Sequence, residues 1–343
     1  MKYLFLICAI LGWVACGGDT VQSDADSGSE VIYDVESDTA TDADSAPDAH
    51  ADADADALPD TDFDADTNVD SDADSTTDTA DLPDTDTDTD ADPTPPIPSE
   101  CERLGSGQDF ADRTFQSFSG AGQTGQYHLY ASGLPTDQAL GLLVQLHGDG
   151  AWEFGRPNSA KLAGMRDIAR DHNMVMIAAK TPDTDTVTWW QQGRDNAEWL
   201  QALIEQVAYQ GYWIDTRRVW FSGYSGGAEF LSYYYIDMMS ETFCDGGALI
   251  SGGGGANSSV PGDIPASPAL KQKFRMHWYS GQDDISENAS DGFCGYCAAQ
   301  QGAAYYQDQG FAKVTTEFPA GVDHYELDEV RVLREQLDAA YPD

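Results

Sequence analysis

Apolar runs and amphipathic segments alternate along the chain from about residue 140 to the C-terminus. Runs that are apolar at nearly every position are typical of strands buried on both faces of a parallel sheet. Such runs lie at 140–146, 174–179, 219–222, 248–250, 274–279 and 314–318. Segments with helical periodicity lie at 160–172, 195–210, 226–239, 298–309 and 326–340. The alternation predicts an α/β domain, a mostly parallel sheet with helices on both faces.

Two segments that alternate apolar and polar residues, 114–118 and 126–131, precede these runs. A glycine-containing turn at 120–125 joins them, so we expect an antiparallel start to the sheet. The stretch 101–343 is long enough for one such domain with a large core.

The clearest helix is 195–210, which carries its apolar residues on one face. Asp195 and Glu198 have the spacing of a capping box, and Gly211 follows the last periodic residue. These signals predict that the helix begins next to Asp195.

The first residues have the form of an export signal. Lys2 precedes an apolar run at 3–15 that is too short to span a bilayer. The run ends at Ala15-Cys16-Gly17, which resembles a bacterial lipoprotein signal in which Cys16 is diacylated, although Trp13 stands where that pattern usually has leucine. We expect a lipoprotein-type signal peptide over 1–16 and a membrane anchor at Cys16. The protein would then lie in the cell envelope, at the outer surface or in the periplasm; plain secretion is the alternative.

The segment 17–100 holds 25 Asp and 3 Glu and no Lys or Arg, in a chain whose net charge is −43. Like-charge repulsion without an apolar core predicts a disordered acidic linker. The stretch 101–343 is also acidic, with 32 acidic and 16 basic residues. Nucleic-acid binding, which needs a positive surface, is therefore disfavoured.

Repeated Asp-x-Asp in the linker suggests calcium as an alternative. A calcium loop of the EF-hand type needs glycine at its sharp turn, and no glycine lies between Gly28 and Gly105. We expect a charged spacer and no metal site.

Four cysteines remain after the signal: Cys101, Cys244, Cys294 and Cys297. An exported protein with four cysteines most simply forms two disulfides, and three pairings are open. The C-x-x-C at 294–297 could also be a redox or zinc motif, but no second C-x-x-C completes a zinc site. A structural disulfide role is favoured.

The chemistry centres on a G-x-S-x-G sequence at 223–227, between an apolar run and a helical segment. In this context Ser225 would sit on a sharp strand-to-helix turn, as nucleophilic serines do. A serine needs a histidine to accept its proton, and only His277 and His324 follow Ser225 in the sequence. His277 falls inside a predicted strand, whereas His324 falls in a loop, so we expect His324 to be the general base.

The acid that orients this histidine should lie just past the end of a strand. Asp283 and Asp284 both follow the run at 274–279. Asp284 is favoured, Asp283 is the alternative and Asp263 the third candidate.

Acyl transfer also needs two backbone N–H donors for the oxyanion. Gly226, after the nucleophile, would supply one, and the Asp149 amide, in the loop after the run at 140–146, the other. His147 is expected to brace this loop.

Four motifs, at 147–150, 223–227, 281–284 and 321–324, together resemble the α/β-hydrolase superfamily. The resemblance extends from about residue 126 to the C-terminus. It is strongest to the secreted branch of polyhydroxyalkanoate depolymerase-like and feruloyl esterase-like enzymes. It implies an α/β-hydrolase fold and a serine esterase that uses no cofactor.

Aromatic residues near the same sheet edge could line the site of an ester substrate, and packing is the alternative for each. They are Trp152, Trp189, Trp190 and Tyr224. Two other functions stay open: a non-catalytic module that binds a polymer or glycan in the cleft, and a serine peptidase.

Overall fold

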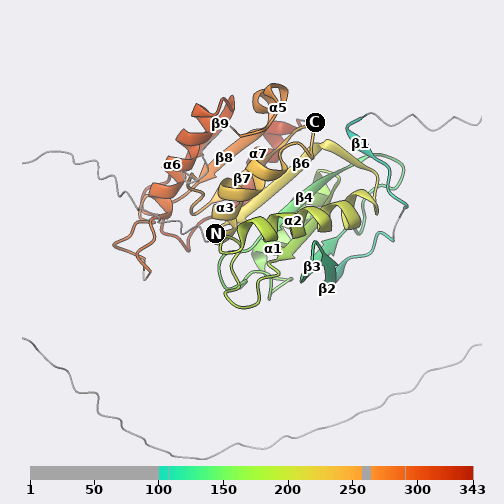
Figure 1. Ribbon diagram of the computed structural model, residues 1–343, viewed down its shortest axis with the longest axis horizontal. Helices are drawn as coiled ribbons and strands as arrows, with labels where there is room; N and C mark the ends of the chain where they lie inside the picture. The colour runs from blue at the N-terminus through green and yellow to red at the C-terminus, as the bar shows by residue number, and fades with distance from the viewer. Residues whose placement is uncertain (1–99, 108, 257–263, 290, 343) are drawn as a thin grey trace, which may run out of the picture. The chain divides into compact units, whose positions relative to one another are not determined.

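The computed structural model describes residues 100–107, 109–256, 264–289 and 291–342 (Figure 1). The chain divides into two units, Met1–Asp86 and Thr87–Asp343, and every described residue belongs to the second. The predicted signal, the lipidation site Cys16 and the predicted linker up to residue 99 lie outside the described residues. In the described part, no helix has the length and apolar character that a bilayer span requires.

One sheet runs through the described domain, with the strand order β2-β3-β5-β4-β6-β7-β8-β9 and β1 paired to β6. Strands β4 to β9 pair in parallel, whereas the pairs β2–β3, β3–β5 and β1–β6 are antiparallel. The strands are β1 (Glu102–Arg103), β2 (Arg113–Gly120), β3 (Gln123–Tyr130), β4 (Leu140–Leu146), β5 (Met174–Lys180), β6 (Ile214–Tyr224), β7 (Gly246–Ser251), β8 (Arg275–Tyr279) and β9 (Lys313–Glu317). The predicted fold class, a mostly parallel sheet with an antiparallel start, is confirmed.

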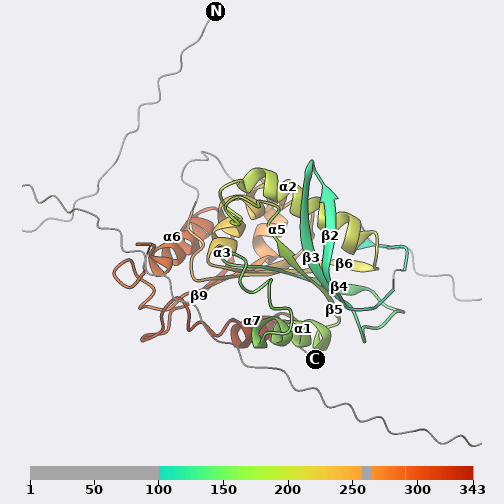
Figure 2. The same ribbon diagram turned by 90° about the horizontal axis from the view of Figure 1, so that it is seen from below.

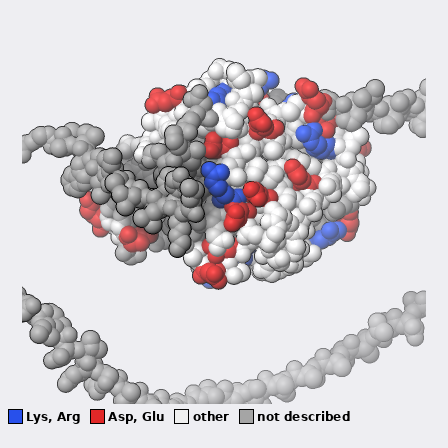
Figure 3. All heavy atoms as spheres, viewed as in Figure 1, with Lys and Arg blue, Asp and Glu red and all other residues white. Residues whose placement is uncertain are grey.

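Helices cover both faces of this sheet. Figure 2 shows α1 and α7 on one face, and α2, α3 and α5 on the other. The helices are α1 (Ala160–Asp171), α2 (Gly193–Leu203), α3 (Gly226–Phe230), α4 (Ile236–Met239), α5 (Pro268–Lys273), α6 (Gly295–Asp308) and α7 (Glu329–Ala340), with π-helical segments η1 (Ile204–Tyr209) and η2 (Leu231–Tyr235). Acidic side chains are distributed over the face seen in Figure 3, with basic ones among them.

The apolar runs form the centre of two cores. All seven residues of β4 are buried. Because successive side chains of a strand point to opposite faces, Leu142 and Val144 join the core under α2, and Leu143 joins the core under α1 and α7. Burying each leucine side chain contributes about 1.5–3 kcal/mol to the free energy of folding. This burial holds the central strands in place, and with them the carboxyl edge of the sheet.

The predicted start of the helix at 195–210 is wrong. Helix α2 begins at Gly193 after Gln192, which makes no side-chain capping bond, and its last turns are the π-helical η1. A Cβ at residue 193 would lie 2.3 Å from the Tyr234 ring. The helix therefore begins where Gly193 packs closely on Tyr234, and not at a capping box at Asp195.

The helix predicted over 226–239 is present with its predicted bounds, as the consecutive segments α3, η2 and α4, of which η2 is π-helical. Helix α5 was not predicted. The remaining predicted strands and helices are present, with ends shifted by a few residues, because tertiary packing decides where an element stops.

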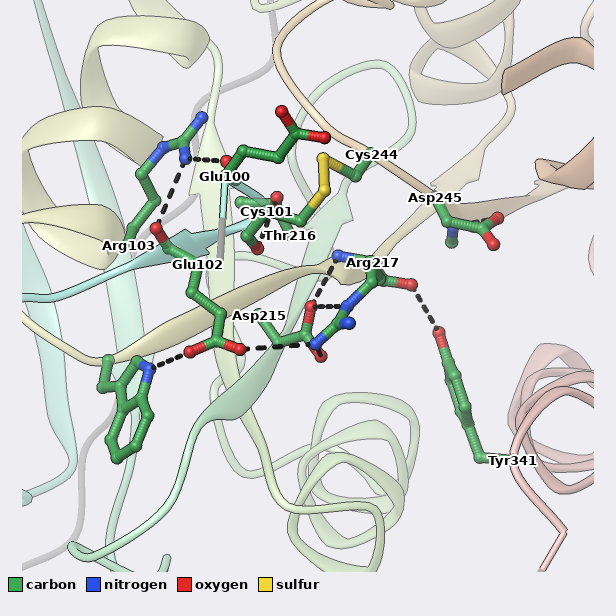
Figure 4. A network of polar contacts seen from close by, with 12 residues as sticks. Glu100, Cys101, Glu102, Arg103, Asp215, Thr216, Arg217, Cys244, Asp245 and Tyr341 are labelled. Carbon is green, nitrogen blue, oxygen red and sulfur yellow. Dashed lines mark hydrogen bonds and ion pairs between the residues drawn. A yellow bond between two sulfur atoms is a disulfide. The ribbon is translucent and has the colours of Figure 1, made fainter. Parts of the chain in front are cut away.

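The four cysteines pair as Cys101 with Cys244 and Cys294 with Cys297, with Cα atoms 5.9 and 5.3 Å apart. The first pair ties the beginning of the described chain to the neighbourhood of β6 (Figure 4). There the Thr216 amide and hydroxyl both donate to the Cys101 carbonyl at 2.8 Å, and Arg217 contacts Glu102 at 3.4 Å. The second pair lies at the first turn of α6, where Cys294 is the N-cap.

Replacing both Cys101 and Cys244 by serine is expected to lower the free energy of unfolding by about 4 kcal/mol, since the bridge closes a long loop in the unfolded chain. The melting temperature should fall by about 10 °C. The matched control is the Cys294→Ser/Cys297→Ser double variant, whose short loop should cost about 1–2 kcal/mol. Thermal melts of both variants, with non-reducing peptide mapping of the parent, provide the measurement. Equal melting temperatures for the parent and the first variant would contradict the pairing.

Candidate active site

Ser225 occupies the turn between β6 and α3. Its backbone has φ +51° and ψ −116°, a left-handed conformation that a residue with a Cβ adopts only under strain. The Ser225 amide donates to the Ser251 carbonyl, at the end of β7, at 2.8 Å. The turn presents the hydroxyl at the carboxyl edge of the sheet, where ligands of parallel sheets bind.

Glycines make this turn possible. A Cβ at Gly223 would lie 2.6 Å from the Gly227 carbonyl oxygen, and one at Gly227 would lie 2.8 Å from the carbonyl oxygens of Leu146 and His147. Real Cβ atoms do not approach backbone so closely. Only glycine therefore allows β6 and α3 to meet at so sharp an angle beside the loop that follows β4.

His324 connects Ser225 to Asp284. Its Nε2 lies 2.9 Å from the Ser225 Oγ, and its Nδ1 lies 2.8 Å from the Asp284 Oδ2. Asp284 is 3% exposed and also accepts a hydrogen bond from the Ser280 hydroxyl at 3.1 Å. An imidazole with its proton on Nδ1 donates to Asp284 and can accept the serine proton at Nε2.

Of the two neighbouring aspartates, only Asp284 contacts the histidine. Asp283 is exposed, its amide donates to the Val322 carbonyl, and its carbonyl accepts from the Asn288 side chain. The third candidate, Asp263, lies outside the described residues. His277 is remote from this constellation, with its Nδ1 2.8 Å from the Thr315 hydroxyl on β9.

Helix α6 packs its first turn on Asp284, which the sequence analysis did not anticipate. A Cβ at Gly295 would lie 2.1 Å from the Asp284 Oδ2, and the Tyr296 amide donates to the Asp284 carbonyl at 2.9 Å. The glycine between the two bridged cysteines thus lets the helix end close over the buried carboxylate.

The two expected oxyanion donors flank the serine. Among the described residues, no loop or cap hydrogen bond uses the amide of Asp149 or of Gly226. The side chain of Asp149 extends over Gly226, since a Cβ there would lie 1.9 Å from its Oδ1. Its Oδ2 accepts from the Trp190 indole at 3.0 Å. Burial raises the pKa of Asp149, and the charge of Asp291 raises it further.

His147 braces the loop before these donors, as expected. It is fully buried, its Nδ1 is 2.6 Å from the Gly148 carbonyl oxygen, and its Nε2 accepts from the Thr181 amide at 3.1 Å. Burial lowers the pKa of His147 to about 4, which keeps the ring neutral.

A buried ionic cluster lies behind the serine and was not predicted. The Lys161 ammonium pairs with Glu329 and, at 3.2 Å, with Glu153. Both glutamates are buried, and in the described structure the Glu329 Oε1 has no hydrogen-bond partner. Burial by itself would lower the pKa of Lys161, but the two carboxylates raise it above its usual value.

This cluster reaches both sides of the site. Glu153 accepts a hydrogen bond from the Gly148 amide at 3.3 Å, next to the expected oxyanion loop. The Lys161 ammonium lies 3.9 Å from the centre of the Tyr224 ring, whose hydroxyl donates to the His324 carbonyl at 2.8 Å. The cluster therefore supports the loop before Asp149 and the backbone of the histidine together.

Three of the four aromatic residues expected near the substrate do line cavities around Ser225. Trp152 and Tyr224 line a cavity of about 600 Å³, and Trp190 lines an adjoining one of about 390 Å³. The expectation for Trp189 is wrong. Its indole is fully buried against His147, Trp199 and Phe230, because the loop before α2 turns it into the core.

In the parts of the chain that the structure describes, no group of three or more His, Cys, Asp or Glu side chains is arranged to hold an ion. The arrangement allows one proton to pass from the Ser225 hydroxyl to the His324 imidazole, next to the amides of Asp149 and Gly226, for which the described structure has no loop or cap hydrogen bond.

No family model and no curated protein matches the chain. Several solved structures are similar to it in fold. A thermostable esterase is 18% identical with a TM-score of 0.47, over 66% of this chain and 62% of the esterase, so the chain spans less than two thirds of that protein.

Poly(aspartic acid) hydrolase-1 from Sphingomonas sp. KT-1 is 13% identical with a TM-score of 0.47, over 68% of this chain and 99% of the hydrolase. The feruloyl esterase module from Clostridium thermocellum is 10% identical with a TM-score of 0.47, over 68% and 89%. At such identities the similarity concerns the path of the chain alone, so a function has to come from the side chains of the site.

Lys161→Met is expected to lower the free energy of unfolding by about 3–5 kcal/mol, because it leaves two buried carboxylates without their cation. The matched control is Arg334→Met, which removes an ion pair with Asp171 whose side chains are 44% and 58% exposed. That loss should cost about 0–1 kcal/mol. Urea unfolding followed by tryptophan fluorescence measures both. Similar losses in the two variants would show that the buried cluster has no special role in stability.

Proposed function

We propose that this protein is a serine esterase that hydrolyses carboxylic esters through an acyl-enzyme on Ser225. One observation carries the proposal: the hydrogen-bonded series from the Ser225 Oγ through both ring nitrogens of His324 to the buried Asp284, at 2.9 and 2.8 Å. Two cavities meet at this serine, which leaves room for the acyl and the alcohol parts of an ester.

The reaction proceeds in two halves. The Ser225 Oγ attacks the ester carbonyl carbon while its proton passes to the His324 Nε2. The tetrahedral intermediate collapses, the bond to the alcohol oxygen breaks, and the alcohol leaves with the proton from His324. Water then attacks the acyl-enzyme with His324 as the base. The acid is released, and the proton returns to Ser225.

The remaining groups stabilise the charges of these steps. The amides of Gly226 and Asp149 donate to the oxyanion, and each such donor contributes about 10²–10³ in rate. Asp284 holds the proton of His324 on Nδ1 and stabilises the imidazolium as it forms. Its burial makes this interaction stronger than it would be in water.

Ser225→Ala is expected to lower kcat/KM for p-nitrophenyl esters by at least about 10⁴-fold, because the nucleophile is removed. The melting temperature should change little, since the backbone turn is kept and only one hydroxyl is lost. Kinetics and a thermal melt on the same preparation check both results. Retained hydrolysis would contradict the mechanism. Absence of hydrolysis in the parent as well, with saturable glycan binding, would instead support a binding module.

The matched pair Asp284→Asn and Asp283→Asn serves as the control for this experiment. The first should lose about 10³–10⁴ in kcat, because the histidine loses its orienting carboxylate. The second removes the same charge one residue away, from a side chain that lines the larger cavity without contacting His324, and should lose far less activity than the first. The reverse order would assign the acid to Asp283.

We also propose that the domain is held at the cell envelope by a lipid on Cys16 and an acidic spacer over 17–100. The support is the sequence alone: an apolar run that ends at Ala15-Cys16-Gly17, followed by a long segment without basic residues. A charged coil of this length would reach at least about 50 Å from the membrane.

Mass spectrometry of the membrane fraction is expected to find a mature N-terminus at acylated Cys16. Cys16→Ser should move the protein from the membrane fraction to the soluble fraction, because the lipid supplies the membrane affinity. Protein found free in the medium, with a different N-terminus, would instead indicate plain secretion.

A further inference from the structure

The smaller cavity, about 390 Å³, includes Ser225 and Gly226, so a substrate bound at the serine reaches it. Its charged lining consists of three carboxylates from separate segments: Asp149, Glu229 and Asp291. No lysine or arginine of the described chain lines it. The larger cavity has one cation in its described lining, Lys161, which is engaged with Glu153 and Glu329.

Glu229 lies at the inner end of the smaller cavity, one turn of helix after the nucleophile. It is half-buried, whereas Asp149 and Asp291 are more open to solvent than Glu229. Its carboxylate accepts from the amides of Gly254 and Gly255 at 2.9 to 3.3 Å. These contacts fix the carboxylate beside the serine.

The carboxylates of this cavity repel one another. Burial, with a smaller contribution from the charge of Asp149, raises the pKa of Glu229 to about 7 in spite of its two backbone donors. Burial and Asp291 together raise the pKa of Asp149. A bound cation would offset this repulsion, whereas a neutral polyol, which brings no charge, would not.

Aromatic rings complete the wall. Trp190, Tyr233 and Phe293 line the same cavity as the three carboxylates. Aromatic faces attract cations, most strongly those that shed water readily, such as quaternary ammonium groups. A narrow cleft lined by charges of one sign also concentrates ligands of the opposite sign.

We propose that this cleft selects esters that carry a positively charged ammonium group, with the cation lodged in the smaller cavity between Glu229 and the aromatic rings. The proposal rests on the esterase function proposed above and adds the chemical class of its substrate. Because the Glu229 amide donates to the Ser225 carbonyl at 3.0 Å and both residues line this cavity, the cation should lie only a few bonds from the ester carbonyl.

Two matched ester pairs test it, each comparing a quaternary nitrogen with a carbon of the same shape. The first pair is acetylcholine, which carries the cation in its alcohol part, and its neutral analogue 3,3-dimethylbutyl acetate. The second pair is ethyl trimethylglycinate, which carries the cation in its acyl part, and its neutral analogue ethyl 3,3-dimethylbutanoate. Each kcat/KM is divided by the hydroxide-catalysed rate of that ester, which removes the intrinsic activation by the charge.

The normalised kcat/KM should be about tenfold or more higher for the cationic member of at least one pair. That preference should shrink as sodium chloride is raised from 50 mM to 500 mM, since salt screens the attraction. A neutral member hydrolysed as well as its cationic partner in both pairs would overturn the proposal. If no ester is hydrolysed faster than by the Ser225→Ala variant, the esterase function itself fails.

Two variants test the cavity. Glu229→Gln keeps a side-chain oxygen for the Gly254 and Gly255 amides and removes the charge, and Asp291→Asn removes another charge of the same lining. Each should reduce the cationic-to-neutral ratio about threefold or more. The control is Glu198→Gln, an exposed charge on α2 that lines neither cavity. A ratio unchanged in both cavity variants, or reduced equally in the control, would overturn the assignment to this cavity.

Discussion

Close packing of backbone against backbone at the turn around Ser225 is the constraint on which the rest of the site depends. Gly223 approaches the Gly227 carbonyl, and Gly227 in turn approaches the carbonyls at the end of β4. These approaches hold Ser225 in a strained conformation, with its amide bound to the end of β7. Three neighbouring strands thereby position one hydroxyl, and the sheet's buried core supplies the free energy that keeps the strain in place.

The carboxylates around this turn differ in their surroundings. Asp284 is buried and fully engaged, with His324 and the Ser280 hydroxyl as its partners. Asp149 and Glu229 instead face a cavity that no described basic residue lines, and the pKa of each is raised by burial. In the proposed mechanism the charge of Asp284 would orient one imidazole, whereas the charges of Asp149 and Glu229 would act on a bound substrate.

Chain order and strand ends suffice to predict which side chains meet at the candidate site. Ser225 has a strand-to-helix context, and Asp284 and His324 follow the last two strands. The position of Trp189 could not be predicted, because no local pattern says whether a loop indole turns inward. Lys161 could not be predicted either, since its ion pair with Glu329 on α7 exists only after distant elements have packed on the same face of the sheet.

The C-x-x-C at 294–297 packs in the fold against the Asp284 carboxylate. The sequence favours a structural disulfide at this motif, and the observed bridge joins cysteines only three residues apart. In the fold, that turn begins α6 and presents Gly295 to the Asp284 carboxylate, too close for any side chain. The bridge therefore closes the turn that packs on this buried carboxylate. In the mechanism proposed above, the burial of Asp284 would strengthen its interaction with the His324 imidazole, because electrostatic attraction is stronger where water is excluded.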